Sequence, residues 1–335
     1  MGTLWAVTAY FNPMRFVSRV ANYRAFRARL TIPLLTIELG FDGRFDLAPS
    51  DADVLVRRSG RDIMWHKELL LNAAIRALPE RCTRVAWLDC DIVFADPTWA
   101  ERAEALLDRH RLVQLFHACH RLGPREAPPS SGAPGRQPDC FSLAHLMENG
   151  RLPDDHFRLA GTSSTYRYTP GIAWAAHRAE IQARGLYEAL ILGSGDRALV
   201  SAACGRQRDF VHKLRMNGKQ ASHYLSWADG VHGWVRGDVT SLPGEVFHLW
   251  HGEVDRRRYC GRYEDLQPHG FDPHRDIARD PDGGWVWTCD KPELRRFVRR
   301  YFEQRCEDGA SDALLPMSPA GQRESWDQDR NRARA

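Results

Sequence analysis

Continuous apolar runs alternate with helical patterns over the first 120 residues, and this alternation constrains the fold more than any other feature. Five runs have the character of buried strands, at residues 4–11, 34–39, 53–58, 84–94 and 112–120. Apolar residues at helical spacing lie between them, at 18–30, 62–79 and 97–110. Strands of this kind are typical of a mostly parallel sheet covered by helices on both faces. The sequence therefore predicts an α/β fold, with ligands bound at the carboxyl ends of the strands.

Local signals place the ends of several of these elements. Ser18 is the expected N-cap of the first helix, Asp62 caps the second, and Pro79 ends it. Further along the chain the pattern predicts three more elements: a strand that leads into a helix at 169–181, a helix at 185–192 and an amphipathic helix at 291–306.

A stretch rich in Pro, Gly and Ser at residues 121–140 divides the chain. It has no apolar period and is predicted to be a flexible loop between two halves of one domain, residues 1–120 and 141–306. The polar residues 307–335 are predicted to be a disordered tail.

Composition excludes several classes of function. Lys and Arg number 47 against 43 Asp and Glu, and they are scattered, so we expect no nucleic-acid partner. No run approaches the ~18 apolar residues of a membrane span. The N-terminus reads as a strand and not as a signal peptide, and the eight cysteines form no CxxC pair. We therefore expect a cytoplasmic protein with reduced thiols.

Two carboxylates interrupt the apolar run VAWLDCDIVF at residues 85–94. In an extended strand Asp89 and Asp91 point to the same face, and in a turn they can still converge on one ion. Buried charge persists only when it is paired or bound to metal, and carboxylate oxygens suit Mg²⁺ or Mn²⁺. The alternative is that one aspartate caps the next helix while the other forms a salt bridge. The pair thus indicates a metal site or a structural ion pair.

The context of this pair resembles the nucleotide-sugar glycosyltransferases of the GT-A fold. In their galactosyltransferase-like and chondroitin-polymerase-like members, a DxD strand of this type follows a helix similar to KELLLNAA at 67–74. The resemblance implies a Rossmann-like, mostly parallel sheet flanked by helices, with a C-terminal extension on the acceptor side. Residues 1–120 would then bind the donor, and 141–306 the acceptor. It also implies that Asp91 ligates the metal, that Asp89 lies near the ribose and the metal, and that Lys67 lies close to the nucleotide.

Asp196, in the stretch GSGDRAL, matches the acidic position of a Gly-rich turn that supplies the catalytic base in similar transferases. A carboxylate placed there can take the proton of an acceptor hydroxyl. Many members have Glu-Asp where this chain has Gly195-Asp196. The alternative is that Asp196 is an ordinary N-cap.

Histidines late in the chain often complete the metal shell of such enzymes. His248 and His251 in VFHLWHGE are the candidates here, and a histidine ligand favours Mn²⁺ over Mg²⁺. Either histidine is otherwise a core residue. The following cluster Arg256-Arg257-Arg258 would lie against a diphosphate or form a solvated basic face.

Three further residues are predicted to bind the donor. Asn12 ends the first strand where a nucleobase would lie, and Glu38 ends the second, where a carboxylate can accept from a base N–H or a ribose hydroxyl. Trp174 can stack on the apolar face of a sugar. The alternatives are that Asn12 forms a turn, that Glu38 is a cap and that Trp174 packs in the core.

The sequence thus predicts a metal-dependent glycosyltransferase that uses a nucleotide diphosphate-sugar, with UDP expected, and an unidentified glycan or other hydroxyl acceptor. Asp196 as base implies inversion. The rivals are a sugar nucleotidyltransferase and an inactive sugar-binding protein of the same fold. Dinucleotide-binding, P-loop and zinc-hydrolase motifs are absent from the sequence.

Overall fold

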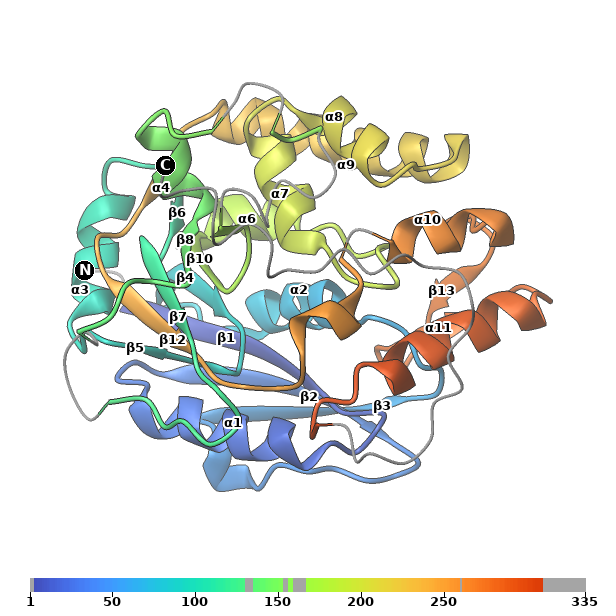
Figure 1. Ribbon diagram of the computed structural model, residues 1–335, viewed down its shortest axis with the longest axis horizontal. Helices are drawn as coiled ribbons and strands as arrows, with labels where there is room; N and C mark the ends of the chain where they lie inside the picture. The colour runs from blue at the N-terminus through green and yellow to red at the C-terminus, as the bar shows by residue number, and fades with distance from the viewer. Residues whose placement is uncertain (1–2, 130–134, 153–155, 159–166, 260, 310–335) are drawn as a thin grey trace, which may run out of the picture.

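A seven-stranded sheet forms the centre of the computed structural model, which describes residues 3–129, 135–152, 156–158, 167–259 and 261–309 (Figure 1). Its strand order is β11-β6-β10-β4-β1-β2-β3. The strands span Val239–Ser241 (β11), Leu112–Gln114 (β6), Ala173–His177 (β10), Cys82–Leu88 (β4), Thr3–Phe11 (β1), Leu34–Phe41 (β2) and Val54–Gly60 (β3). Neighbouring strands in this sheet are parallel except where β10 pairs antiparallel with β4 and β6. The predicted α/β fold with a mostly parallel sheet is confirmed.

Helices bury both faces of this sheet. Alternate residues of β1 point to opposite faces, so that Val7 joins one hydrophobic core and Ala6 joins the other. The first core lies against α2 (Lys67–Ala77), α6 (Arg178–Arg184), α7 (Gly195–Ala203) and α9 (Gly218–Val235). The second lies against α1 (Val17–Arg29) and α3 (Trp99–Leu107). Double coverage explains why these strands are continuously apolar.

A smaller sheet lies beside the first and receives the chain where two predicted strands break. Its order is β5-β12-β7-β8-β9. The strands span Ile92–Phe94 (β5), Glu245–His248 (β12), Ala118–Arg121 (β7), Cys140–Ser142 (β8) and Tyr168–Thr169 (β9). The predictions of single strands at 84–94 and 112–120 are therefore wrong, because each run leaves the large sheet and enters the small one. The apolar pattern continues across the break since both sheets are buried.

The remaining elements of the described residues lie mostly in the second half of the chain. They are α4 (Leu143–Glu148), α8 (Gln207–Lys213), α10 (Arg262–Leu266), α11 (Pro292–Gln304), the hairpin of β13 (Ile277–Arg279) and β14 (Trp285–Trp287), and three 3₁₀ turns, η1 (Pro49–Asp51), η2 (Val254–Arg257) and η3 (Gln267–His269). Residues 185–192 are not helical, so that prediction is wrong.

Two predicted helix caps are replaced by distant partners. The helix α1 begins at Val17, and its first backbone N–H groups, on Val17 and Ser18, donate to the two carboxylate oxygens of Asp308, at 2.9 and 2.7 Å. The predicted cap Ser18 instead donates its hydroxyl to the carbonyl of Glu307. The free N–H groups of a first turn need acceptors, and a carboxylate 290 residues away supplies them.

The helix α2 begins only at Lys67, so the prediction that Asp62 caps it is also wrong. The Asp62 carboxylate accepts from the backbone N–H of Trp287 at 3.0 Å and fastens the hairpin to the segment before α2. The predicted stop is confirmed, because Leu78 is the C-cap and Pro79 follows it.

The ends and surface of the chain bear on its partners. Glu307 is buried, so the packed part of the chain passes the predicted boundary at 306, while residues 310–335 lie outside the described residues.

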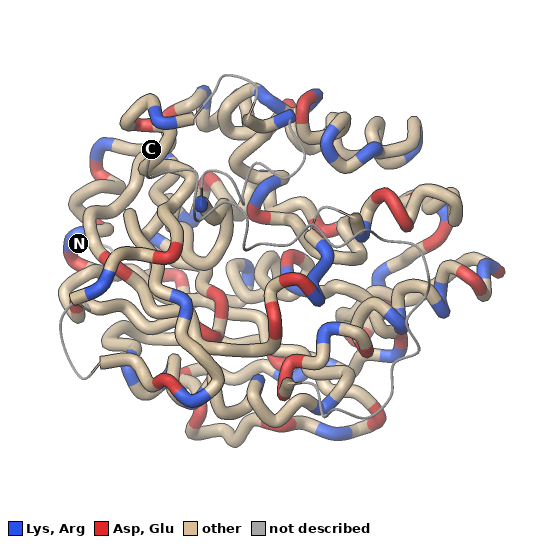
Figure 2. Tube along the Cα trace, viewed as in Figure 1, with Lys and Arg blue, Asp and Glu red and all other residues tan. Residues whose placement is uncertain are grey.

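Segments of Lys and Arg alternate with segments of Asp and Glu along the trace (Figure 2), in line with the nearly balanced charge. Within the described residues no helix has the length and apolar character that crossing a membrane requires.

Candidate functional site

The Asp89-Cys90-Asp91 turn carries the chain from β4 to β5, and therefore from one sheet to the other. The backbone N–H of Asp89 donates to the carbonyl of Ile172, and the carbonyl of Asp91 accepts from Leu249, so both aspartates are fixed to neighbouring segments. The turn sends the two carboxylates to different partners. Asp89 meets Lys67, while Asp91 meets two histidines.

Lys67 joins the predicted donor aspartate to the predicted base. Its Nζ lies 2.5 Å from Oδ1 of Asp89 and 2.9 Å from Oδ2 of Asp196. Although burial opposes its charge, Asp196 and Asp89 hold the pKa of the Lys67 ammonium well above its usual range. Burial also raises the pKa of Asp196, against the lowering effect of Lys67. The first turn of α2 thus fixes two carboxylates with one buried cation.

The strand register of the small sheet brings Asp91 to the histidines. Ile92 in β5 pairs with His248 in β12, so Asp91 and His248 meet at adjoining strand ends. The Asp91 carboxylate lies 3.7 Å from Nε2 of His248 and 3.1 Å from Nε2 of His251. One ligand atom from each of the three residues lies within 4.8 Å of the others. The structure therefore brings together three of the four predicted metal ligands, and Asp89 lies outside this group.

The electrostatics of this cluster fit a divalent cation. Burial, and then the Arg257 charge, lowers the pKa of His248 to about 3 and that of His251 to about 4, so both imidazoles are neutral. One oxygen of Asp91 is buried and has no hydrogen-bond partner in the described part of the chain. Two neutral imidazoles and a carboxylate form a donor set for a divalent metal ion. These residues fit the divalent ion implied by the sequence.

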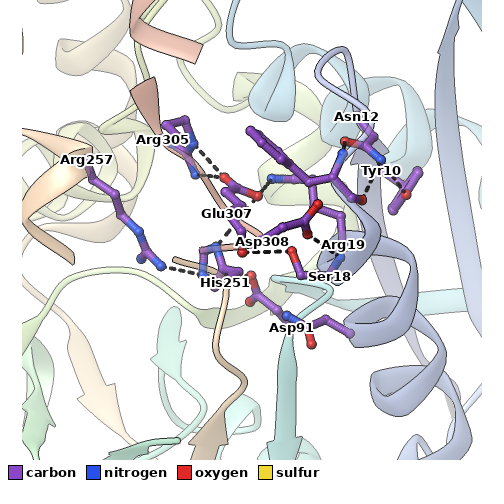
Figure 3. Close-up of polar contacts among 12 residues, drawn as sticks. Tyr10, Asn12, Ser18, Arg19, Asp91, His251, Arg257, Arg305, Glu307 and Asp308 are labelled. Carbon is purple, nitrogen blue, oxygen red and sulfur yellow. Dashed lines mark hydrogen bonds and ion pairs between the residues drawn. The ribbon is translucent and has the colours of Figure 1, made fainter. Parts of the chain in front are cut away.

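Arginines and the C-terminal segment surround His251 (Figure 3). Arg257 donates from Nη2 to Nε2 of His251 at 2.7 Å and so engages the lone pair that faces Asp91. Behind the ring, Nδ1 of His251 lies 3.9 Å from the carboxylate of Glu307. Burial opposes ionisation of Glu307, but Arg19 and Arg305 hold its pKa well below the usual range. Glu307 therefore remains a negative charge that favours a proton on Nδ1 and a lone pair on Nε2.

Gly252 allows this segment to pass directly behind His251. Its φ is +85°, and a Cβ there would lie 2.9 Å from the carbonyl oxygen of Cys306 and 3.0 Å from that of Arg305. Both the backbone conformation and the close approach thus require glycine.

Asp196 lies in the first turn of α7, and its carboxylate accepts from Lys67 and does not act as the N-cap, which is Ser194. Packing against α2 explains why the preceding residue, Gly195, is a glycine. A Cβ on Gly195 would lie 2.0 Å from Oε1 of Glu68, a buried residue of α2. A carboxylate from α2 therefore occupies the space that a side chain at position 195 would take, which explains the departure from the Glu-Asp pattern.

Replacing Gly195 by alanine is expected to destabilise the fold by about 1–3 kcal/mol, because the new methyl group overpacks against Glu68. Thermal unfolding of Gly195→Ala checks this. Gly230→Ala in α9 is the matched control, since nothing lies within 4 Å of a Cβ there. The double variant Glu68→Ala/Gly195→Ala should regain part of the loss, and no regain would show that Glu68 is not the obstacle.

Glu68 is also expected to make stability depend on pH. Burial, with Asp196 adding to it, raises the pKa of Glu68 to about 8, well above its value of 4.5 in an unfolded chain. The protonated form favours the folded state, so this stability is present below pH 4.5 and is lost as the pH rises toward 8. Glu68→Gln, which cannot ionise, should therefore gain stability relative to the wild type between pH 5 and 8, by about 1.4 kcal/mol for each pH unit in that interval. Denaturant titrations of both proteins across this range provide the measurement, and parallel pH profiles would contradict it.

The side chains of Asn12 and Glu38 form hydrogen bonds to backbone groups and do not present free polar groups. The Asn12 amide accepts from the backbone N–H of Phe16 and donates to its carbonyl, closing the turn after β1. Glu38 is buried and accepts from the backbone N–H groups of Asp46 and Leu47. The Asn12 contacts match its structural alternative, a turn, whereas Glu38 anchors a loop instead of acting as the cap that was its alternative.

The prediction that Trp174 stacks on a sugar is wrong. Its ring is fully buried in the hydrophobic core, and its indole N–H donates to the carbonyl of Pro170 at 2.9 Å. No face of the ring is left for a ligand, because the ring is packed in the core between the large sheet and its helices.

Two residues of the site were missed by sequence reasoning. Glu68 had a signal, a carboxylate directly before the apolar run Leu69-Leu70-Leu71 of its helix. Glu307 had none, because its role depends on the return of the C-terminal segment to α1 and His251.

No protein-family model matches the chain, and no curated protein matches it. Three solved structures illustrate what it is similar to. Glucosyl-3-phosphoglycerate synthase from Mycobacterium tuberculosis, in complex with Mn²⁺, UDP and phosphoglyceric acid, is 12% identical over 88% of this chain and 91% of its own, with a TM-score of 0.41. The catalytic domain of Drosophila β1,4-galactosyltransferase 7 is 12% identical over 88% and 98%, with a TM-score of 0.34. The synthase of 4-diphosphocytidyl-2C-methyl-D-erythritol from Anaerococcus prevotii, a nucleotidyltransferase, is 14% identical over 73% and 88%, also with a TM-score of 0.34.

These likenesses concern the arrangement of the elements and do not extend to substrates. Two of these structures, the synthase from Mycobacterium tuberculosis and the galactosyltransferase, belong to the nucleotide-sugar transferases that the sequence resembles.

Proposed function

We propose that the chain is a metal-dependent glycosyltransferase that moves a sugar from a nucleotide diphosphate-sugar, with UDP as the nucleotide, to an acceptor hydroxyl with inversion. The observation that carries this proposal is the pair of adjoining clusters at the β4–β5 turn. Asp91, His248 and His251 converge on one side of the turn, and Lys67 joins Asp89 to Asp196 on the other. A cation site beside a fixed carboxylate is the arrangement that donor activation and acceptor deprotonation need.

Asp91, His248 and His251 would hold the ion. When bound, Mn²⁺ or Mg²⁺ supplies positive charge that neutralises the departing diphosphate. Binding requires Arg257 to release Nε2 of His251, because its N–H now engages that lone pair. The released guanidinium remains close to the site and is suited to contact phosphate oxygens.

The residues of the second cluster act on the sugar and the acceptor. Lys67 holds Asp89 where it can accept from a ribose hydroxyl, and it holds one oxygen of Asp196. Asp196 takes the proton of the acceptor hydroxyl as that oxygen attacks the anomeric carbon. Burial favours the protonated form of Asp196 in the product state and so assists this transfer.

Titration of UDP into the full chain with and without Mn²⁺ tests the proposal. We expect UDP to bind at least tenfold more tightly with Mn²⁺, and Asp91→Asn to abolish that gain. The exposed Asp290 provides the matched control, Asp290→Asn, which should behave as the wild type. Equal affinity with and without metal would contradict the proposal and favour an inactive sugar-binding protein.

A screen of nucleotide-sugars with Mn²⁺ separates the enzyme classes by product. A glycosyltransferase that leaks donor to water releases nucleoside diphosphate. Release of pyrophosphate in the presence of a sugar phosphate and a nucleoside triphosphate would instead identify a nucleotidyltransferase.

A further inference from the structure

Two helices of the C-terminal half, α10 and α11, pack against each other (Figure 1). A basic cavity lies between them. It encloses about 370 Å³, a volume within the range of small-molecule sites. Three arginines and one aspartate line it, together with the apolar Phe297 and Pro268.

The positive charge of this cavity is not balanced by the protein. Asp265 is taken by Arg258, with 2.6 Å between the guanidinium and the carboxylate. Arg262 is only 3% exposed, yet it donates to two hydroxyls, those of Ser194 at 2.6 Å and Tyr301 at 2.7 Å. Neither Arg262 nor Arg300 forms an ion pair with any carboxylate of the described ranges. A buried cation without a counter-charge is unfavourable, so an anion bound here would supply a missing interaction.

The same arginine joins the cavity to the proposed catalytic base. Ser194, which accepts from Arg262, is the N-cap of α7, two residues before Asp196. On its other side the Arg262 guanidinium lies 4.9 Å from the ring of Tyr259, whose hydroxyl accepts from Arg257, the partner of His251. Arg257 therefore contacts His251 of the proposed metal cluster, and Arg262 lines the cavity.

We infer that this cavity binds the anionic group, a phosphate or a carboxylate, of a small acceptor whose hydroxyl is presented to Asp196. The inference rests on the proposed function and adds the chemical class of the acceptor. Guanidinium groups match the geometry of phosphate and carboxylate oxygens, and one Arg262 side chain spans from the cavity wall to the turn that carries the base.

The test uses the full chain with UDP and Mn²⁺ and three probes at constant ionic strength: glycerol 1-phosphate, glycerate and glycerol. Arg300→Met removes a cavity charge at an exposed position, and Arg299→Met, next to it on α11 but outside the lining, is the matched control. We expect at least one anionic probe to bind to the wild type and to Arg299→Met. The same probe should bind at least tenfold more weakly to Arg300→Met, and glycerol should not bind. In a separate assay with a nucleotide-sugar that the chain hydrolyses in place of UDP, the bound anion should also change the rate of donor hydrolysis, because it occupies the acceptor position.

Two results would overturn the inference. Anion binding that is equal in Arg300→Met and Arg299→Met would remove the cavity as the site. Binding that leaves donor hydrolysis unchanged would make the cavity an effector site and not an acceptor site. Metal-dependent UDP binding is measured separately, so its loss would count against the proposed function and not against the cavity.

Discussion

Replacing Asp196 by asparagine is expected to lower the rate of UDP release from the donor by a factor of about 10²–10⁴, the usual contribution of a general base. Asparagine keeps an oxygen that can accept from Lys67, so the local geometry is preserved, but the side chain can no longer take a proton. Metal-dependent UDP binding should be unchanged, because Asp196 is not part of the Asp91–histidine cluster. Initial rates and calorimetric UDP titrations on the same preparation provide both readouts.

The matched control for this variant is Asp209→Asn. Asp209 also lies in the first turn of a helix, α8, and pairs with a basic residue, Arg206, at 2.7 Å. It should retain wild-type turnover. Full turnover in Asp196→Asn with normal UDP and metal binding would rule out this residue as the base and remove the reason to expect inversion.

Replacing Lys67 by methionine is expected to destabilise the fold by about 3–5 kcal/mol, the range for removing one partner of a buried ion pair. The side chain is only 11% exposed, and its loss leaves Asp89 and Asp196 facing each other without a cation. Chemical denaturation at neutral pH measures the change. Arg76→Met, at an exposed position of the same helix, is the control and should cost little.

A second substitution tests the cause of that loss. If uncompensated negative charge is responsible, Lys67→Met/Asp89→Asn should recover part of the stability lost in Lys67→Met. Equal stability of the single and double variants would point instead to lost packing of the lysine stem.

The alternation of apolar strands and helices predicted the large sheet because each strand is buried on both faces, as the two cores around β1 show. Periodicity cannot reveal that the run at 84–94 changes sheets, since burial is the same before and after the turn. The resemblance grouped Lys67 with Asp89 and Asp91, but it did not predict that Lys67 binds Asp196, 129 residues away. Contacts of this kind depend on the packing of α7 against α2, which no local pattern encodes.

The sequence predicted the candidate site best where short strand patterns place the residues that meet. Asp91, His248 and His251 meet because two short strands pair in register, and the resemblance suggested a metal at these residues. Asn12 and Glu38 were predicted from their position at strand ends, and Trp174 because an aromatic ring can stack on a sugar. The structure gives these three side chains backbone partners and core packing instead, which the position of a residue in a strand does not reveal.

Two acids near the end of the chain have a consequence for biosynthesis. The carboxylate of Asp308 lies at the start of α1, and that of Glu307 lies behind His251. A ribosome makes α1 first and these two acids almost 300 residues later, so a nascent chain carries an uncapped first helix for most of translation. The surroundings of His251 can be completed only after the whole domain has emerged. If Asp91, His248 and His251 hold an ion, the charge behind His251 is therefore in place only after translation, and a protease that trimmed the chain after Arg305 would remove that charge without touching the three residues.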